Sequence, residues 1–249
     1  MGLFDNMTKN VAIDRNRGSQ NVPSVAIGNA GEEVFPQPLS TVETNKLIRN
    51  TYMLLSMTLL FTAVTAGLAM ATKMPHPGFW ISLLGTLGLF FLTYWLRNSA
   101  WGVLAVFALT GFMGLTLGPT LNAYMHAYSN GHELIMMSFG STAAIFLGLS
   151  GYALTTRKDF SFMGAFLFAG LIVAILASIG AWLFSMPGLA LAVSAIMVLL
   201  MAGYILYDTS NMVHGHETNY IMATVMLYVD IYLLFVHLLH LFGALMGED

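Results

Sequence analysis

Seven long apolar stretches follow one another through most of this sequence, and they decide what the chain can fold into. They cover residues 50–72, 77–96, 100–124, 134–155, 162–185, 188–211 and 219–243. Each is close to the roughly 20 residues that a helix needs to cross a bilayer. Charged residues make up only 8% of the chain, against about 25% in an ordinary soluble domain. The sequence therefore predicts an all-α integral membrane protein with seven transmembrane helices.

Turn-forming or polar residues separate these stretches clearly at all points but one. The weakest separation is Met186-Pro187-Gly188, because a proline can kink one long helix as readily as end it. The apolar run from 162 to 211 is nevertheless far too long for a single span. We therefore expect two helices joined tightly at this point.

Residues 1–46 differ in composition from the rest of the chain. They contain Gly, Asn, Ser, Pro and mixed charges without sustained apolar periodicity, which is typical of a disordered, solvent-exposed tail. The first apolar run begins only near Thr51, too late for a cleavable signal peptide, so it is expected to remain as an anchor. The predicted organisation is a tail at 1–46 and one seven-helix transmembrane domain at 47–249.

The basic residues predict the orientation of the helices, because Lys and Arg in short loops favour the cytoplasmic side. With the N-terminus in the cytoplasm, the inner side receives five of them and the outer side one, Lys73. The five are Lys46, Arg49, Arg97, Arg157 and Lys158. Seven spans then place the tail in the cytoplasm and the C-terminus on the periplasmic side.

Two aspartates, Asp208 and Asp230, interrupt the last two apolar stretches. A charged side chain at the bilayer centre costs roughly 2.5–3.5 kcal/mol on insertion scales, so such residues are candidates for a functional site. Both approach the membrane from the cytoplasmic side. At the rise of an α-helix, Asp208 lies about 9 Å from His214 and Asp230 about 15 Å from Tyr220 along the helix axes. Each aspartate is therefore the expected partner of the other.

Two carboxyl groups that meet in a low-dielectric setting share one proton, because desolvation and like-charge repulsion both oppose double ionisation. Holding the proton ties the two helices together by a hydrogen bond, and losing it makes them repel. The pair is thus a candidate pH sensor and gate. When deprotonated, Asp208 and Asp230 also offer hard oxygen ligands that suit calcium. The chain contains no cysteine, which excludes thiolate metal sites.

Two other ionisable side chains, His237 and Arg97, each allow two interpretations. His237 follows Asp230 by seven residues and falls on nearly the same helix face. It is either part of an ion or proton path or a histidine hydrogen-bonded to a neighbouring helix. Arg97 is either an anchor at the cytoplasmic side or a partner for one aspartate. The histidine-containing loop at 214–217 has no second cluster of ligands to complete a metal site.

Three motifs lie between residues 203 and 243. They are Tyr207-Asp208-Thr209-Ser210, His214-Gly215-His216-Glu217-Thr218-Asn219-Tyr220-Ile221 and Leu227-Tyr228-Val229-Asp230-Ile231. Together they resemble the signature of the transmembrane Bax inhibitor motif family, in particular its bacterial YccA-like branch. The resemblance implies that six helices surround a central C-terminal helix, in a bacterial inner membrane.

The resemblance also implies two alternative functions. The first is a pH-sensitive, calcium-permeable leak gated by Asp208 and Asp230, with an arginine of the second helix as latch; Arg97 is the candidate here. The second is direct binding to an FtsH-type membrane protease, which modulates its degradation of membrane substrates. The expected partners are the bilayer, calcium ions, protons and this protease, with no nucleic acid and no cofactor. His237 and His240 on the last helix depart from the family pattern.

An enzymatic role fits the sequence poorly. Aspartates on two successive helices resemble intramembrane aspartyl proteases, but Leu227-Tyr228-Val229 precedes Asp230 in place of a Gly-x-Gly pattern, and no proline follows Pro187. A retinal receptor needs a Schiff-base lysine in the last helix, whereas the final lysine is Lys158. We therefore expect a protein that is not an enzyme.

Overall fold

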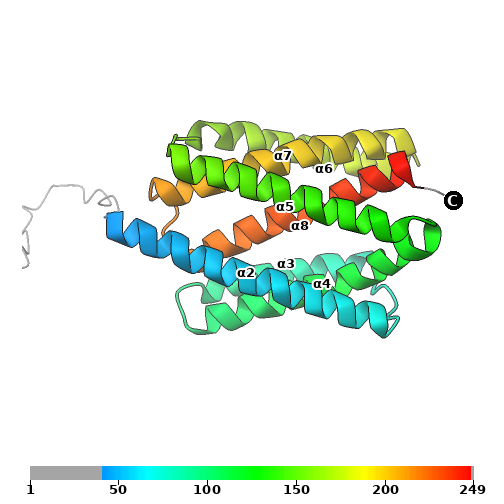
Figure 1. The fold of residues 1–249 in the computed structure, drawn as a ribbon, viewed down its shortest axis with the longest axis horizontal. Coiled ribbons are helices and arrows are strands. Elements are labelled where there is room, and N and C mark those ends of the chain that lie inside the picture. Colours follow the sequence, from blue (N-terminus) through cyan, green and yellow to red (C-terminus); the bar gives the residue numbers. More distant parts are fainter. Residues whose placement is uncertain (1–40, 248–249) are drawn as a thin grey trace, which may run out of the picture. The chain divides into compact units, whose positions relative to one another are not determined.

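The computed structural model describes residues 41–247, which form seven long helices and one short 3-10 helix, with no strand in that range. The helices are α2 (Thr41–Ala71), α3 (Phe79–Leu96), α4 (Trp101–Ala127), α5 (Gly131–Thr156), η2 (Ser161–Met163), α6 (Gly164–Leu183), α7 (Pro187–Val213) and α8 (Tyr220–Met246). The seven long helices, with η2 counted as part of α6, are each long and apolar enough to cross a membrane. They run alternately in opposite directions (Figure 1). The predicted all-α fold with seven transmembrane helices is confirmed.

The first helix begins earlier than the hydropathy of the sequence predicts. α2 starts at Thr41 and carries Glu43 in its first turn, where a negative charge is stabilised by the helix dipole. Leu47 is buried in the core together with residues of α7 and α8. Residues 41–46 of the segment predicted as tail therefore belong to α2, and Leu47, the first residue of the predicted transmembrane domain, packs this end of α2 on the bundle. The rest of the predicted tail, residues 1–40, lies outside the described residues.

The ambiguous separation at Pro187 is a helix boundary. α6 ends at Leu183, and α7 begins at Pro187 itself. A proline at the first helical position lacks only an N–H group that would have no partner inside the helix. Ser185, between the two helices, has a left-handed φ of 49°. The two tightly joined helices predicted for residues 162–211 are therefore present.

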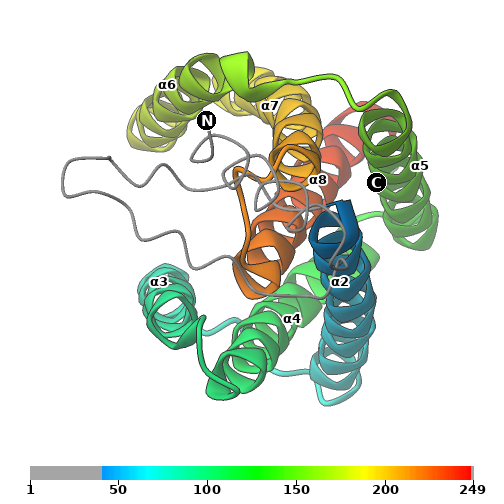
Figure 2. The same ribbon diagram turned by 90° about the vertical axis from the view of Figure 1, so that its left-hand side faces the viewer.

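The last helix, α8, packs against α7, α5, α2 and α4. Figure 2 shows it between α7 on one side and α2 and α4 on the other. α3 packs mainly on α4, and α6 packs on α7. Only Thr93 of α3 is buried, so α3 covers little of the interior. The expectation that all six other helices surround α8 is therefore not confirmed, because α3 and α6 pack chiefly on the helices next to it.

Hydroxyl groups and close backbone contacts hold α2, α4 and α8 together. The Tyr228 hydroxyl lies 2.8 Å from Thr62 Oγ1, and that Thr62 oxygen donates to the Thr110 carbonyl at 3.0 Å. Beside them, a Cβ built on Gly114 would lie 2.6 Å from the Thr62 carbonyl oxygen. Small residues allow membrane helices to approach this closely. One wall of the site described below, α8, is thus anchored to two helices on its far side.

Candidate functional site

The packing of α7 on α8 brings Asp208 and Asp230 together. Asp208 is 8% exposed and Asp230 is 6% exposed. Both side chains line the same cavity and lie close enough to act on each other electrostatically. The two aspartates that the sequence analysis paired are therefore neighbours in the fold.

The segment between α7 and α8 positions the start of α8 relative to α7. The Asn219 side chain accepts hydrogen bonds from the backbone N–H groups of Ile221 and Met222, at 2.9 and 3.2 Å. Such an N-cap satisfies donors that the first turn of a helix leaves free. The Asn219 amide also donates to the Arg97 carbonyl at 3.0 Å and to Asn98 at 2.9 Å. These hydrogen bonds join the start of α8 to the loop after α3. They thereby fix how far Asp230 lies from this end of the bundle.

A cavity of about 620 Å³ reaches the aspartate pair. Most of its wall is apolar and comes from α3, α6, α7 and α8. Its polar lining consists of Tyr204, Tyr207, Asp208, Asn211, His216, Glu217 and Asp230. Because Glu217 and His216 belong to the loop between α7 and α8, the cavity joins the buried pair to one end of the bundle. This end is the one predicted to face the cytoplasm.

The electrostatics of the pair disfavour two ionised carboxyl groups, because both side chains are buried. Asp230 Oδ2 is buried and has no hydrogen-bond partner among the described residues. A buried polar atom without a partner costs about 1–3 kcal/mol, and a charged one costs more. Glu217 adds a third negative charge close enough to act on Asp208. A proton shared by the two carboxyl groups would lower this cost.

The two carboxyl groups do not by themselves make a site for a resident metal ion. Calcium takes about 6–8 oxygen ligands in proteins. Within residues 41–247, no group of three or more His, Cys, Asp or Glu side chains is placed to hold a metal ion. Asp208 and Asp230 would supply two carboxylates, and most other ligands of a bound calcium ion would be water.

Arg97 does not join the aspartate pair. Its guanidinium lies over the ring of Tyr94, with 4.3 Å between the Arg97 Cζ atom and the ring centroid. The hydrogen bonds and ion pairs of the described residues include none between Arg97 and either aspartate. The physical reason is depth, since Arg97 follows the last residue of α3 while Asp208 and Asp230 lie inside their helices. Of the two interpretations of Arg97, this arrangement favours the anchor over the latch.

His237 lies farther along α8 and does not line the cavity at the aspartates. Its Nδ1 atom is 3.2 Å from the Ser194 hydroxyl of α7, and Nδ1 of His240 is 2.8 Å from the same oxygen. Ser194 is only 2% exposed. One serine therefore holds both histidines, which matches the interpretation of His237 as a histidine hydrogen-bonded to a neighbouring helix.

Several site residues were not found from the sequence. Tyr204 precedes Asp208 by one helical turn and so lies on the same face, and this spacing is a signal that could have been used. Glu217 belongs to the quoted motif, but its position at the cavity depends on the fold of the loop. Ser194 has no sequence signal, because serine is common in such helices and only the facing histidines distinguish it.

The chain is similar along nearly its whole described length to known proteins. Residues 44–247 match the family described as "Inhibitor of apoptosis-promoting Bax1". An uncharacterised protein of Pseudomonas aeruginosa is 50% identical over 207 residues, which cover 83% of this chain and 93% of that protein. The protein named "Modulator of FtsH protease YccA" of Escherichia coli K12 is 47% identical over 204 residues, 82% of this chain and 92% of the relative. A similar protein of Escherichia coli O6:H1 is named "Inner membrane protein YccA".

Proposed function

Because the chain belongs to the family described as inhibitor of apoptosis-promoting Bax1, we propose that it is a non-enzymatic membrane protein that binds and modulates an FtsH-type protease. The observation that carries this proposal is the likeness to the modulator YccA, at 47% identity over 92% of that protein. The matched region includes the seven helices and the aspartate pair. We infer the same setting, a bacterial inner membrane, with the N-terminus in the cytoplasm.

The fold supports binding through the membrane-embedded surface. α3 buries one residue, Thr93, and Trp80, Phe91 and Trp95 of this helix are exposed. The face of α3 that points away from α4 is therefore open to lipid or to the helices of another membrane protein. A modulator needs such a surface and needs no catalytic group.

Co-expression with an FtsH-type protease tests this function. The full chain should co-purify with the protease in detergent, and its overproduction should slow the turnover of a membrane substrate of that protease. A matched control is a seven-helix membrane protein of another family at the same expression level. Absence of co-purification together with unchanged substrate turnover would contradict the proposal.

A second function is supported by a different observation, the buried carboxyl pair at the end of an open cavity. The proposal is a pH-dependent calcium leak in which Asp208 and Asp230 are the gate. With one shared proton, the pair holds α7 to α8. Once that proton is lost, the two carboxylates repel each other and become ligands for an entering cation. Flux should therefore rise as the pH rises on the cavity side.

Proteoliposomes that contain the purified protein test the leak. Calcium flux should depend on pH in the wild type, and Asp208→Asn and Asp230→Asn should both abolish this dependence. Asp159→Asn is a matched control, because Asp159 is an exposed aspartate that lines neither cavity. A wild-type protein without flux, or variants with the same pH profile as the wild type, would rule out the dyad as a gate. Neither result bears on protease binding.

A further inference from the structure

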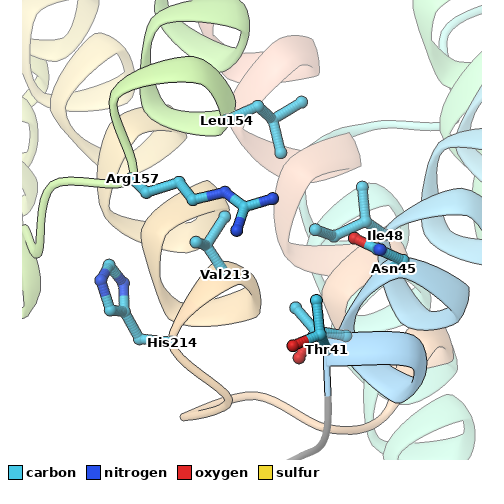
Figure 3. A pocket seen from close by; sticks show the side chains of 8 residues that line it. Thr41, Asn45, Ile48, Leu154, Arg157, Val213 and His214 are labelled. Atoms are coloured by element: carbon cyan, nitrogen blue, oxygen red, sulfur yellow. The ribbon is translucent and has the colours of Figure 1, made fainter.

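A second cavity, of about 410 Å³, lies at one end of the bundle, where α2 begins and where α5 and α7 end. It is formed by the first two turns of α2, the last turn of α5 with the residue that follows it, and the end of α7 (Figure 3). It shares no lining residue with the cavity at Asp208 and Asp230. Its chemistry is therefore independent of the aspartate pair.

Hydrogen-bond donors dominate the polar lining of this cavity. α2 contributes the hydroxyls of Thr41 and Thr44 and the amide of Asn45, and the α5 side contributes the guanidinium of Arg157. No Asp or Glu is among the lining residues. The positive end of the α2 dipole lies on the same side, and Glu43 of this first turn is not among the lining residues. The cavity is suited to an anion.

Arg157 is the cation that faces the cavity. Figure 3 shows its side chain reaching from the end of α5 toward Asn45 and Ile48 of α2. Within residues 41–247, Arg157 takes part in no ion pair. The nearby Asp159 is engaged elsewhere, because its Oδ1 accepts a hydrogen bond from the Ser161 backbone N–H at 2.8 Å. The guanidinium therefore has charge and donors to offer to a ligand.

The C-terminal cap of α5 does not depend on the side chain of Arg157. Arg157 caps α5 with φ 50° and ψ 30°, in the left-handed region. Glycine is the usual residue in such a cap, since a residue with a Cβ is strained there. The cap itself uses only the Arg157 backbone N–H, which donates to the Ala153 carbonyl at 3.0 Å. A glycine would form the same cap with less strain.

Part of the cavity lining is apolar. Ile48, Leu154 and Val213 line it, and all three belong to membrane-spanning helices. The Arg157 guanidinium therefore lies close to aliphatic side chains of the bundle (Figure 3). A phospholipid offers a partner for each, a phosphate for the guanidinium and acyl chains for the aliphatic side chains.

We propose that this cavity binds a phosphate group, and that its place at the ends of membrane-spanning helices selects the phosphate of an anionic phospholipid. Arg157 binds two phosphate oxygens through its planar fork of N–H groups, and Thr41, Thr44 and Asn45 complete the contacts. A zwitterionic lipid fits less well, since its ammonium group would lie near Arg157. Soluble inorganic phosphate is the other source of the same chemistry.

Arg157→Gly separates binding from folding, because glycine keeps the left-handed cap while removing the guanidinium. The matched control is Lys158→Gln, which removes one positive charge from the adjacent residue outside the cavity lining. The full chain of each variant is placed in phosphatidylcholine nanodiscs, with or without phosphatidylglycerol, and with or without inorganic phosphate. The measurements are the melting temperature and the phosphatidylglycerol retained in native mass spectrometry.

Phosphatidylglycerol should raise the melting temperature of the wild type and of Lys158→Gln but not of Arg157→Gly. Loss of the charge-assisted contacts should weaken retention of this lipid about tenfold in Arg157→Gly. A rise that depends on Arg157 with inorganic phosphate alone would support the phosphate site and assign it to the soluble anion. Equal losses in Arg157→Gly and Lys158→Gln, or no dependence on either anion, would overturn the proposal. Asn45→Leu, which keeps Arg157, should show a smaller loss of the same kind.

Discussion

Asp230 of α8 and Asp208 of α7 line the same cavity, and the Oδ2 atom of Asp230 is buried with no hydrogen-bond partner among the described residues. A pair of this kind links the contact between two helices to a single proton. The same link makes the stability of the whole bundle depend on pH, whether or not an ion passes through it.

The first prediction concerns this dependence. At low pH the shared proton joins α7 to α8, and as the pH rises its loss leaves two buried carboxylates that repel each other. The wild type should therefore lose stability as the pH rises from acid toward neutral, by about 1–3 kcal/mol. Asp208→Asn should flatten this part of the profile, since an amide does not titrate. Melting temperatures in detergent across this pH range measure the effect, and a wild-type profile as flat as that of the variant would contradict it.

A second prediction rests on the loop between α5 and α6. The backbone N–H of Ser161, and then its side chain, lower the pKa of Asp159, with smaller contributions from His214 and His216. A carboxyl whose pKa is lowered on folding stabilises the fold above its unfolded pKa and loses this effect as the pH falls through the folded value. The start of η2 should therefore loosen below about pH 4. Hydrogen exchange at the Ser161 amide should accelerate there, and Asp159→Asn should remove that acceleration.

The third prediction concerns Ser194, whose hydroxyl lies within hydrogen-bond distance of both His237 and His240. Ser194→Ala should destabilise the protein by about 1–3 kcal/mol, because two histidine nitrogens lose a partner. Ser178→Ala is the matched control, since the Ser178 hydroxyl donates only to the Ala174 carbonyl of its own helix at 2.8 Å. Thermal unfolding compares the two variants. Similar melting temperatures would show that the shared contact contributes little.

The fourth prediction tests the close approach of α2 and α4. A Cβ at Gly114 would lie 2.6 Å from the Thr62 carbonyl oxygen, whereas a Cβ at Gly140 meets nothing within 4 Å. Gly114→Ala should destabilise by about 1–3 kcal/mol through overpacking against the backbone. Gly140→Ala should stabilise by roughly 0.5–1 kcal/mol, because alanine favours a helix over glycine. The difference in melting temperature between the variants checks the packing of these helices.

Hydropathy alone was sufficient to find the seven spans and the tight junction at Pro187, since partition into a membrane depends on the residues within one stretch. The near absence of other charges inside the apolar stretches was sufficient to pair Asp208 with Asp230, although their depths estimated from the helix rise differ by about 6 Å. The motifs around them predicted the family, and the match of residues 44–247 confirms it. Hydropathy placed the start of the first helix too late, because the polar first turns of α2 are held by packing of Leu47.

The tertiary structure decided which side chains meet. Arg97 lies over Tyr94 and not at the aspartates, His237 shares Ser194 with His240, and Arg157 faces a cavity built from three helix ends. These contacts depend on how each helix is rotated and tilted against its neighbours. In an apolar span every face is hydrophobic enough for the bilayer, so the sequence pattern does not determine that rotation. The chain's sequence thus determined how many helices cross the membrane and at what depth the charges lie, and packing determined their partners.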